Sequence, residues 1–102
     1  MFIEGLNFYQ AAKAAVIGMT RGLARDLGPD GIRLNAITPG WIMTQRQIEL
    51  WLTPEAEAAL MVAQCLKEKV YPPDIARMAL WLAADDSRLV TAQNFVVDGG
   101  RM

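Results

Sequence analysis

Two short apolar segments that lie far apart in the sequence constrain the fold of this chain most strongly. Residues 32–38 are typical of a strand, and Pro39-Gly40 ends that strand abruptly. Residues 94–98 are a second strand candidate, whose three central residues are all apolar, as expected for a strand covered on both faces. Because helical segments separate the two, the strands should run parallel and be joined by a right-handed crossover. The sequence therefore predicts an α/β fold.

The longest helix is predicted before the first strand. Asn7 and Gln10 have the spacing of a capping box, so the helix should begin near Phe8. Gly28-Pro29 should end it. Apolar residues recur between these points at spacings of three and four and make one stripe, namely Ala12, Val16, Met19, Leu23 and Leu27.

Two more helices are predicted between the strands. Thr53 provides a hydroxyl cap for a helix that should run to about Leu66, and Pro72-Pro73-Asp74 precedes another that should end before Asp85-Asp86-Ser87. Between residues 41 and 52 no regular period is visible. The acidic pair at 85–86 is interpreted as a solvated helix end.

Two parallel strands do not make a stable sheet unaided, because the backbone groups at their outer edges would lack partners. We therefore expect either that an N-terminal part with further strands is missing from this chain, or that other copies supply them. The 102 residues should form a single unit, residues 1–102, with one core that is partly shared with something else.

Composition excludes several classes of function. The formal net charge is −1 and the basic residues form no block, which argues against nucleic acid and anionic membranes as partners. A single cysteine and no histidine exclude a disulfide framework and a four-cysteine zinc site, so no metal is expected. No apolar run approaches the ~18 residues that span a bilayer, and no signal sequence is visible, so a cytoplasmic location is predicted.

Tyr9 and Lys13 are the first candidates for chemistry. They lie four residues apart on one predicted helix, so their side chains project from the same face. A free phenol loses its proton near pH ~10, and an ammonium within a few ångströms favours the phenolate. Tyr9 is then able to exchange a proton with an alcohol or carbonyl, although this pattern by itself far more often marks a surface contact.

Further motifs give this pair a context. Tyr9-Gln10-Ala11-Ala12-Lys13, the strand Asn35-Ala36-Ile37-Thr38, Pro39-Gly40 with Thr44, and Asp98-Gly99-Gly100 occur in a characteristic order and spacing. The chain resembles the C-terminal portion of short-chain dehydrogenases/reductases over essentially its whole length. The resemblance implies the C-terminal part of a Rossmann-like, doubly wound parallel sheet whose N-terminal strands are missing.

The resemblance also implies roles for individual residues. Tyr9 would be the general acid/base, and Lys13 would favour its deprotonated form and hydrogen-bond the nicotinamide ribose. The nicotinamide pocket would be lined by Pro39, Gly40, Ile42 and Thr44. The cofactor would be NAD or NADP, with NAD favoured, and the protein would form a homo-oligomer, a dimer or a tetramer.

In that family the glycine-rich phosphate turn, the residue that selects NAD or NADP and the catalytic serine all precede the tyrosine. Eight residues cannot contain them, and no Gly-x-Gly-x-x-Gly opens a helix here. We therefore expect the chain alone to be inactive, since it lacks the main cofactor anchor and one partner of the tyrosine.

The segment after Gly40 most resembles bacterial aldose 1-dehydrogenases of the D-xylose type. The residues that carry this likeness are Thr44, Arg46-Gln47, Trp51, Thr53-Pro54-Glu55, Glu57 and Ala63-Gln64-Cys65-Leu66-Lys67. Arg46, Gln47 and Trp51 would then bind a sugar, and the reaction would convert an aldose to its lactone. Alternatively, Trp51 covers the core beneath a loop.

Two other functions stay open at this point. One keeps the family but changes the substrate to another alcohol or carbonyl, such as a 3-oxoacyl thioester; the other is a non-catalytic assembly module. Cys65 is predicted to be an inert thiol buried on a helix, and the stretch 95–97 resembles a segment through which family members associate. Helix packing is the predicted role of four large side chains, Met43, Met61, Met78 and Trp81.

Overall fold

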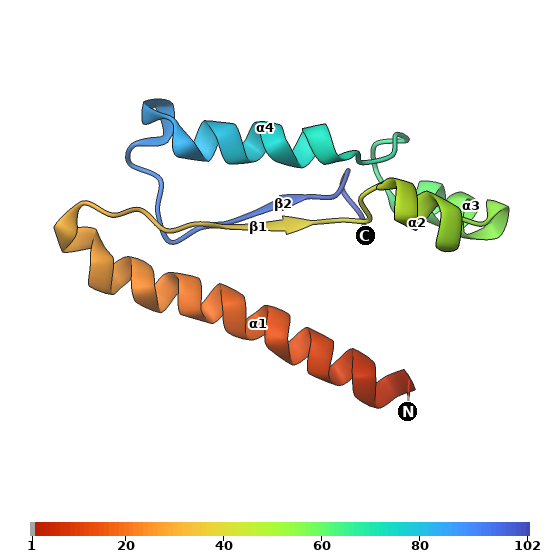
Figure 1. Cartoon of the computed structure of the whole chain (residues 1–102), viewed down its shortest axis with the longest axis horizontal. Coiled ribbons are helices and arrows are strands. Elements are labelled where there is room, and N and C mark those ends of the chain that lie inside the picture. The colour runs from red at the N-terminus through yellow and green to blue at the C-terminus, as the bar shows by residue number, and fades with distance from the viewer. Residues whose placement is uncertain (1) are drawn as a thin grey trace.

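A computed structural model describes the backbone of residues 2–102 and the side chains of residues 8–102. The chain forms helices on both sides of a small sheet, as Figure 1 shows. In chain order the elements are α1 (Phe2–Leu27), a 3₁₀ turn (Gly28–Asp30), β1 (Ala36–Pro39), α2 (Gln45–Leu50), α3 (Pro54–Ala63), α4 (Pro72–Ala83), a 3₁₀ turn (Asp85–Ser87) and β2 (Asn94–Val97). The predicted α/β class is confirmed.

The two strands pair in parallel, as the order of elements predicts. Ala36 lies opposite Asn94 and Pro39 opposite Val97, and the pairing continues one step further where the Gly40 amide donates to the Val97 carbonyl at 2.9 Å. α4 and α1 lie on opposite sides of this pair, and α1 diverges from it toward its N-terminus (Figure 1). The layers are those of a crossover unit taken from a larger sheet.

The helix boundaries differ from the predicted ones at two ends. α1 begins at Phe2, so the predicted start near Phe8 is wrong; Asn7 lies within the helix, and its side chain is outside the described side chains. α3 ends at Ala63 rather than near Leu66. It stops there because the next amides, of Cys65 and Leu66, donate to the Gly100 and Gly99 carbonyls at 2.9 Å instead of continuing the helix.

This early end of α3 also changes the environment of Cys65. The thiol is exposed and lies outside the helix, so the prediction of a buried helical cysteine is wrong. The neighbouring side chain is the one that is buried: Gln64 is 2% exposed, and its amide nitrogen donates to the Leu66 and Glu68 carbonyls at 2.9 and 2.7 Å. A polar side chain therefore organises this loop.

β1 begins at Ala36, four residues later than the predicted strand 32–38, and extends one residue beyond it. Before Ala36, side-chain hydrogen bonds join this segment to the one that precedes β2. Leu34 N donates to the Thr91 hydroxyl, and the Asn35 side-chain amide donates to the Val90 carbonyl. Ala92 has φ of 62°, which interrupts the extended conformation on the opposite segment. β2 ends at Val97, one residue before the predicted end.

A short helix, α2, lies in the stretch where the sequence shows no period. Thr44 caps it, and its hydroxyl accepts a hydrogen bond from Gln47 N at 3.2 Å. The predicted starts of the other two helices are confirmed. The Thr53 hydroxyl accepts from Ala56 N at 3.1 Å at the start of α3, and Asp74 accepts from Tyr71 N at 2.8 Å at the start of α4.

The apolar stripe of α1 is only partly buried against the sheet. Thr20 and Ala24 are the buried residues of the described part of the helix, at 8% and 3% exposure, and small side chains there let the helix approach the strands. Val16, Met19 and Leu23 remain 53%, 60% and 41% exposed. Because nothing within this chain covers them, α1 presents an open apolar face.

β2 is also less covered than its sequence predicts. Phe95 packs edge-to-face against Trp81 of α4, with ring centroids 6.0 Å apart, whereas Val96 is 56% exposed. α4 and α1 both contact β1, and Val96 of β2 is exposed, so the prediction that both faces of β2 are covered is wrong within the described residues. Of the large residues predicted to pack, Met43 is buried, Met61 and Met78 are half-buried, and Trp81 is 40% exposed.

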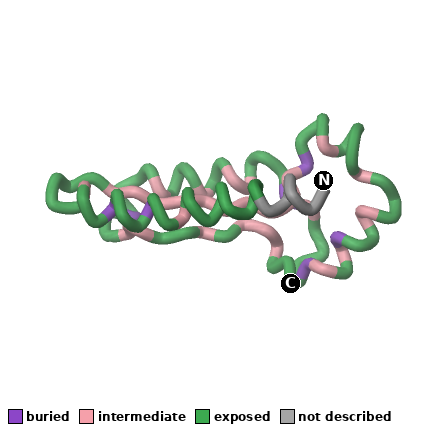
Figure 2. The backbone as a smooth tube through the Cα atoms, turned by 90° about the horizontal axis from the view of Figure 1, so that it is seen from below, coloured by how far each residue is buried: buried purple, intermediate pink, exposed green. Residues whose placement is uncertain are grey.

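The dimensions of the molecule agree with these open faces. Its accessible surface is 7698 Å², whereas a compact protein of 11.3 kDa exposes about 5,700 Å². Its radius of gyration is 16.1 Å, compared with about 13 Å for a compact domain of this length. Figure 2 shows the buried positions as short, separate segments. The described residues therefore do not form a compact, closed core.

Candidate active site

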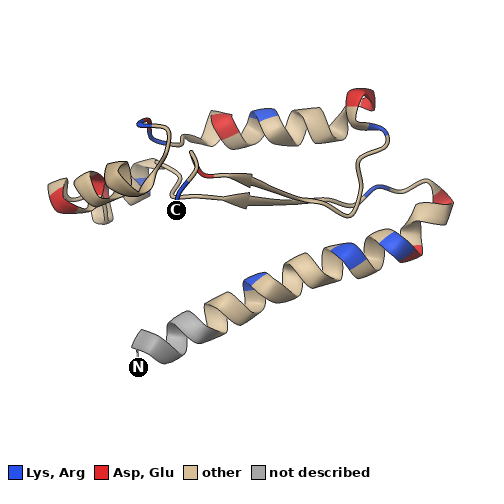
Figure 3. Ribbon diagram, turned by 180° about the vertical axis from the view of Figure 1, so that it is seen from behind, with Lys and Arg blue, Asp and Glu red and all other residues tan. Residues whose placement is uncertain are grey.

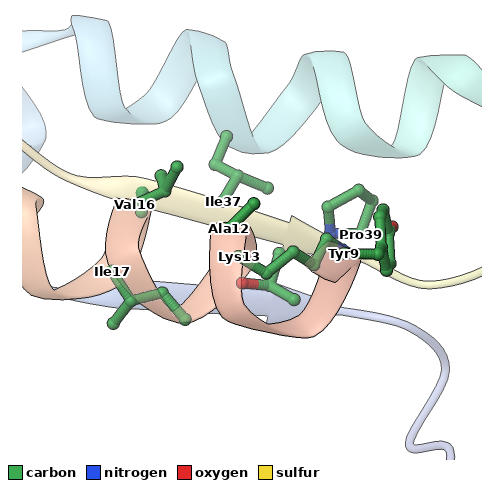
Figure 4. A pocket seen from close by; sticks show the side chains of 9 residues that line it. Tyr9, Ala12, Lys13, Val16, Ile17, Ile37 and Pro39 are labelled. Atoms are coloured by element: carbon green, nitrogen blue, oxygen red, sulfur yellow. The ribbon is translucent and has the colours of Figure 1, made fainter. Parts of the chain in front are cut away.

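Tyr9 and Lys13 come together on α1, as their spacing predicts. The Lys13 ammonium nitrogen lies 5.2 Å from the centroid of the Tyr9 ring, within the range of a cation–π contact. Both side chains line a largely apolar cavity of about 240 Å³ between α1 and β1, and Figure 4 shows them close to Pro39. Tyr9 is 58% exposed, so a ligand has access to it.

The end of β1 brings Pro39 and Gly40 next to this pair. In open α/β sheets, ligands bind outside the carboxyl ends of the strands, which is where these residues lie. Gly40 is required there by packing: a Cβ atom on it would lie 2.6 Å from Asp98 Cβ and 2.8 Å from Asp98 Cα. Glycine thus allows the chain to leave β1 while remaining in contact with the end of β2.

A second pocket, of about 300 Å³, lies directly beyond Gly40. Three predicted cofactor residues line it, Gly40, Ile42 and Thr44, together with Gln47 and Trp41. The Trp41 indole nitrogen donates to the side-chain oxygen of Gln47 at 2.8 Å. This hydrogen bond joins the segment that leaves β1 to helix α2.

The segment between Gly40 and α2 is held firmly at its base. Ile42 forms a parallel bridge with Val70, and the amide of Met43, which is 3% exposed, donates to the Val70 carbonyl at 2.7 Å. Thr44 N donates to Ile42 O at 2.9 Å. These contacts fix the direction in which Thr44 and Gln47 leave the sheet.

The structure does not bring all predicted site residues together. Arg46 and Trp51 are exposed and line neither of the two pockets, and Trp51 is 62% exposed, so it does not cover the core of this chain. Trp41 was not predicted as a site residue. The available signal was its position directly after Pro39-Gly40, where a parallel strand ends.

Charge is distributed without a dominant patch. Figure 3 shows basic residues along α1 and residues of both signs on α4 and in the loops. Lys69 and Glu57 form an ion pair, and the hydrogen bond that the Lys69 ammonium donates to the Glu57 carboxylate raises the pKa of Lys69 above its usual value. Among the side chains of residues 8–102, no group of three or more His, Cys, Asp or Glu is arranged to hold a metal ion. None of the described helices has the length and apolarity to cross a bilayer.

The fold and the position of the site define a doubly wound α/β protein of the Rossmann-like class. A family model described as "Enoyl-(Acyl carrier protein) reductase" matches residues 1–101. D-xylose 1-dehydrogenase of Caulobacter vibrioides is 48% identical over 98 residues, which are 96% of this chain and 39% of that protein. The probable galactose dehydrogenase GalD of Rhizobium meliloti is 50% identical over 92 residues, 90% of this chain and 36% of that protein.

Solved structures agree with these relatives. A 4-hydroxyisoleucine dehydrogenase complexed with NADH superposes with a TM-score of 0.85 at 36% identity, covering 90% of this chain and 38% of that one. A 3-oxoacyl-[acyl-carrier protein] reductase from Brucella melitensis gives 0.85 at 39% identity, covering 91% and 34%. The chain belongs to the short-chain dehydrogenase/reductase family. It spans about two fifths of the length of the curated relatives that it matches.

The described residues suit one end of a nicotinamide cofactor. Tyr9, Lys13 and Gly40 surround the carboxyl end of β1, where an ammonium, a phenol and an uncrowded backbone are available to a ribose and a flat ring. No glycine-rich turn that could hold a pyrophosphate is present in the described part. The fit is therefore to the nicotinamide end alone.

Proposed function

We propose that the complete protein containing this chain is a nicotinamide-dependent sugar dehydrogenase that oxidises an aldose at C1 to its lactone. The observation that carries the proposal is the Lys13 ammonium 5.2 Å from the Tyr9 ring, at the cavity beside the end of β1. The sugar dehydrogenases among the relatives support the substrate class. NAD is the proposed cofactor, with NADP as the alternative.

Tyr9 is the proposed general base for this reaction. Its phenolate oxygen takes the proton of the C1 hydroxyl while the C1–O bond becomes a carbonyl, and the C1 hydrogen leaves with its electron pair as hydride. A nicotinamide held at the carboxyl end of β1 would supply the acceptor for that hydride. Lys13 stabilises the phenolate and binds the ribose, and Pro39, Gly40, Ile42 and Thr44 line the nicotinamide pocket.

The proposed sugar-binding residues are Arg46 and Gln47, both of α2, and Trp51, which directly follows that helix. Gln47 lines the second pocket, and Arg46 and Trp51 are its neighbours in sequence. Trp51 N donates to the Gln47 carbonyl, so the two residues are one helical turn apart. Arg46 and Trp51 are proposed to contact the sugar from the edge of the second pocket.

The apolar face of α1 is proposed to be covered in the complete protein, by the preceding strands and by other copies of the chain. The exposed Val16, Met19 and Leu23 support this, as does the surface in excess of a compact chain. Alone, the 102 residues are proposed to have no dehydrogenase activity, because they contain only the nicotinamide end of the site.

The test uses a fusion protein in which residues 1–102 replace the matched C-terminal segment of the Caulobacter D-xylose 1-dehydrogenase. A panel of pentoses and hexoses is assayed with NAD and with NADP by absorbance of the reduced nicotinamide. Oxidation of D-xylose or another aldose is expected. If the fusion protein oxidises none of the sugars but reduces a 3-oxoacyl thioester, the alternative substrate suggested by the Brucella reductase is favoured.

A further inference from the structure

The strongest unassigned feature is the contact between Trp41 and Gln47 at the pocket beyond Gly40. Both side chains are half-buried and both line the pocket. Their hydrogen bond is 2.8 Å long and joins the segment that leaves β1 to helix α2. The sequence contains three tryptophans, and Trp41 is the one that lines either pocket of the site.

This hydrogen bond decides which end of the Gln47 amide is free. An indole N–H is a donor and never an acceptor, so the amide oxygen of Gln47 must face Trp41. The amide nitrogen therefore points elsewhere and retains two N–H donors. Thr44 cannot reverse this orientation, because its hydroxyl accepts from the backbone N of Gln47 rather than from the side chain.

We infer that Trp41 and Gln47 form a specificity-determining pair that binds a polyol at this pocket. The Gln47 amide donates to an oxygen acceptor of the ligand, and the indole of Trp41 provides apolar surface for the carbon skeleton. The inference rests on the proposed function and deepens it. It predicts that the ligand presents hydroxyl or ring oxygens here, where an acyl chain would leave the amide N–H groups without partners.

Three variants of the fusion protein separate these contributions. Gln47→Glu still accepts from the Trp41 indole but offers no donor to a ligand. Trp41→Phe retains an aromatic ring and removes the indole N–H, and Trp41→Leu removes the ring. Gln45→Glu is the matched control, because it makes the same chemical change on the same helix at an exposed side chain that lines neither pocket; the hydrogen bond that it removes, from Gln45 Nε2 to Glu49 Oε1, is also exposed.

The readouts are KM for the aldose, KM for the nicotinamide cofactor, kcat, and aldose affinity by isothermal titration calorimetry. Gln47→Glu and Trp41→Leu are expected to raise the aldose KM and dissociation constant about tenfold, with the cofactor KM changed less than threefold. Trp41→Phe should have a smaller effect, and Gln45→Glu should change neither constant more than twofold. Deoxy-aldoses identify which hydroxyl Gln47 contacts. The deoxy-aldose that lacks this hydroxyl should bind the unchanged fusion protein more weakly than the parent sugar does. It should bind the Gln47→Glu variant as tightly as the parent sugar binds that variant.

The outcomes distinguish the two proposals. If the fusion protein oxidises aldoses and both Gln47→Glu and Trp41→Leu keep an unchanged aldose KM, the pair has no role in specificity while the proposed function stands. If the fusion protein oxidises no aldose but calorimetry shows sugar binding that these variants weaken, the pair binds a polyol and the proposed reaction is wrong. Equal losses in Gln45→Glu would overturn the inference as well.

Discussion

Replacing Gly40 by alanine tests how the end of the sheet positions the site. The added Cβ would lie 2.6 Å from Asp98 Cβ and 2.8 Å from Asp98 Cα, whereas carbon atoms in contact are normally about 3.5–4.0 Å apart. Asp98 Cα belongs to the backbone, so no side-chain rotation relieves the clash. The ends of β1 and β2 must separate by roughly 1 Å.

The magnitude follows from two costs. Overpacking of this kind costs about 1–3 kcal/mol. A separation of that size also breaks the 2.9 Å hydrogen bond from Gly40 N to Val97 O, which contributes about 1 kcal/mol. The combined loss is about 2–4 kcal/mol, equivalent to a fall in the unfolding midpoint of roughly 5–15 °C for a protein of the size of the fusion protein.

The assay is thermal unfolding of the fusion protein followed by circular dichroism, with Gly22→Ala as the matched control. Gly22 lies inside α1, and a Cβ on it would meet nothing within 4 Å. Alanine there is expected to raise the midpoint, because glycine within a helix costs about 0.5–1 kcal/mol relative to alanine. Opposite signs for the two variants support the reasoning. A Gly40→Ala midpoint within 1 °C of the unchanged protein would refute it.

Three further predictions use other contacts. Lys13→Met should lower kcat of the fusion protein at least tenfold and raise the cofactor KM, because it removes the ammonium from the Tyr9 ring; equal kinetics would exclude a role for this lysine. Gln64→Leu should lower the free energy of unfolding by roughly 2–4 kcal/mol, because two loop carbonyls lose their donor. An unchanged unfolding midpoint would show that water replaces the amide. Since its ion pair raises the pKa of Lys69, the stability that Glu57→Gln removes should be present at pH 7 and lost as the pH rises above about 10.5; a difference that persists at higher pH would contradict this assignment.

Local signals in the sequence predicted the fold class and the starts of α3 and α4. Thr53 and the prolines at 72–73 mark helix starts through short-range hydrogen bonding and a fixed φ, which are visible in the sequence. The four-residue spacing of Tyr9 and Lys13 likewise fixes a shared helix face. The order of helices and strands was sufficient to predict a parallel pair.

Features that depend on distant partners were not predictable in this way. α3 ends at Ala63 because the C-terminal glycines supply carbonyls to the next amides, a contact between residues more than thirty positions apart. Val96 and Met19 belong to apolar patterns that predict burial, yet they are exposed, because burial depends on what packs against a face and not on the periodicity of the face itself. Trp41 was missed because its role arises from a side-chain contact with Gln47, which no periodicity signals.

The central claim is that Tyr9 carries the proton in the reaction. Its most direct test is kcat of the Tyr9→Phe fusion protein with D-xylose and NAD, measured beside Tyr71→Phe, an exposed tyrosine outside both site pockets. General acid–base catalysis contributes about 10²- to 10⁴-fold, so Tyr9→Phe should lose at least a hundredfold in kcat while the dissociation constant for NAD changes less than threefold. A kcat within tenfold of the unchanged fusion protein would contradict the claim.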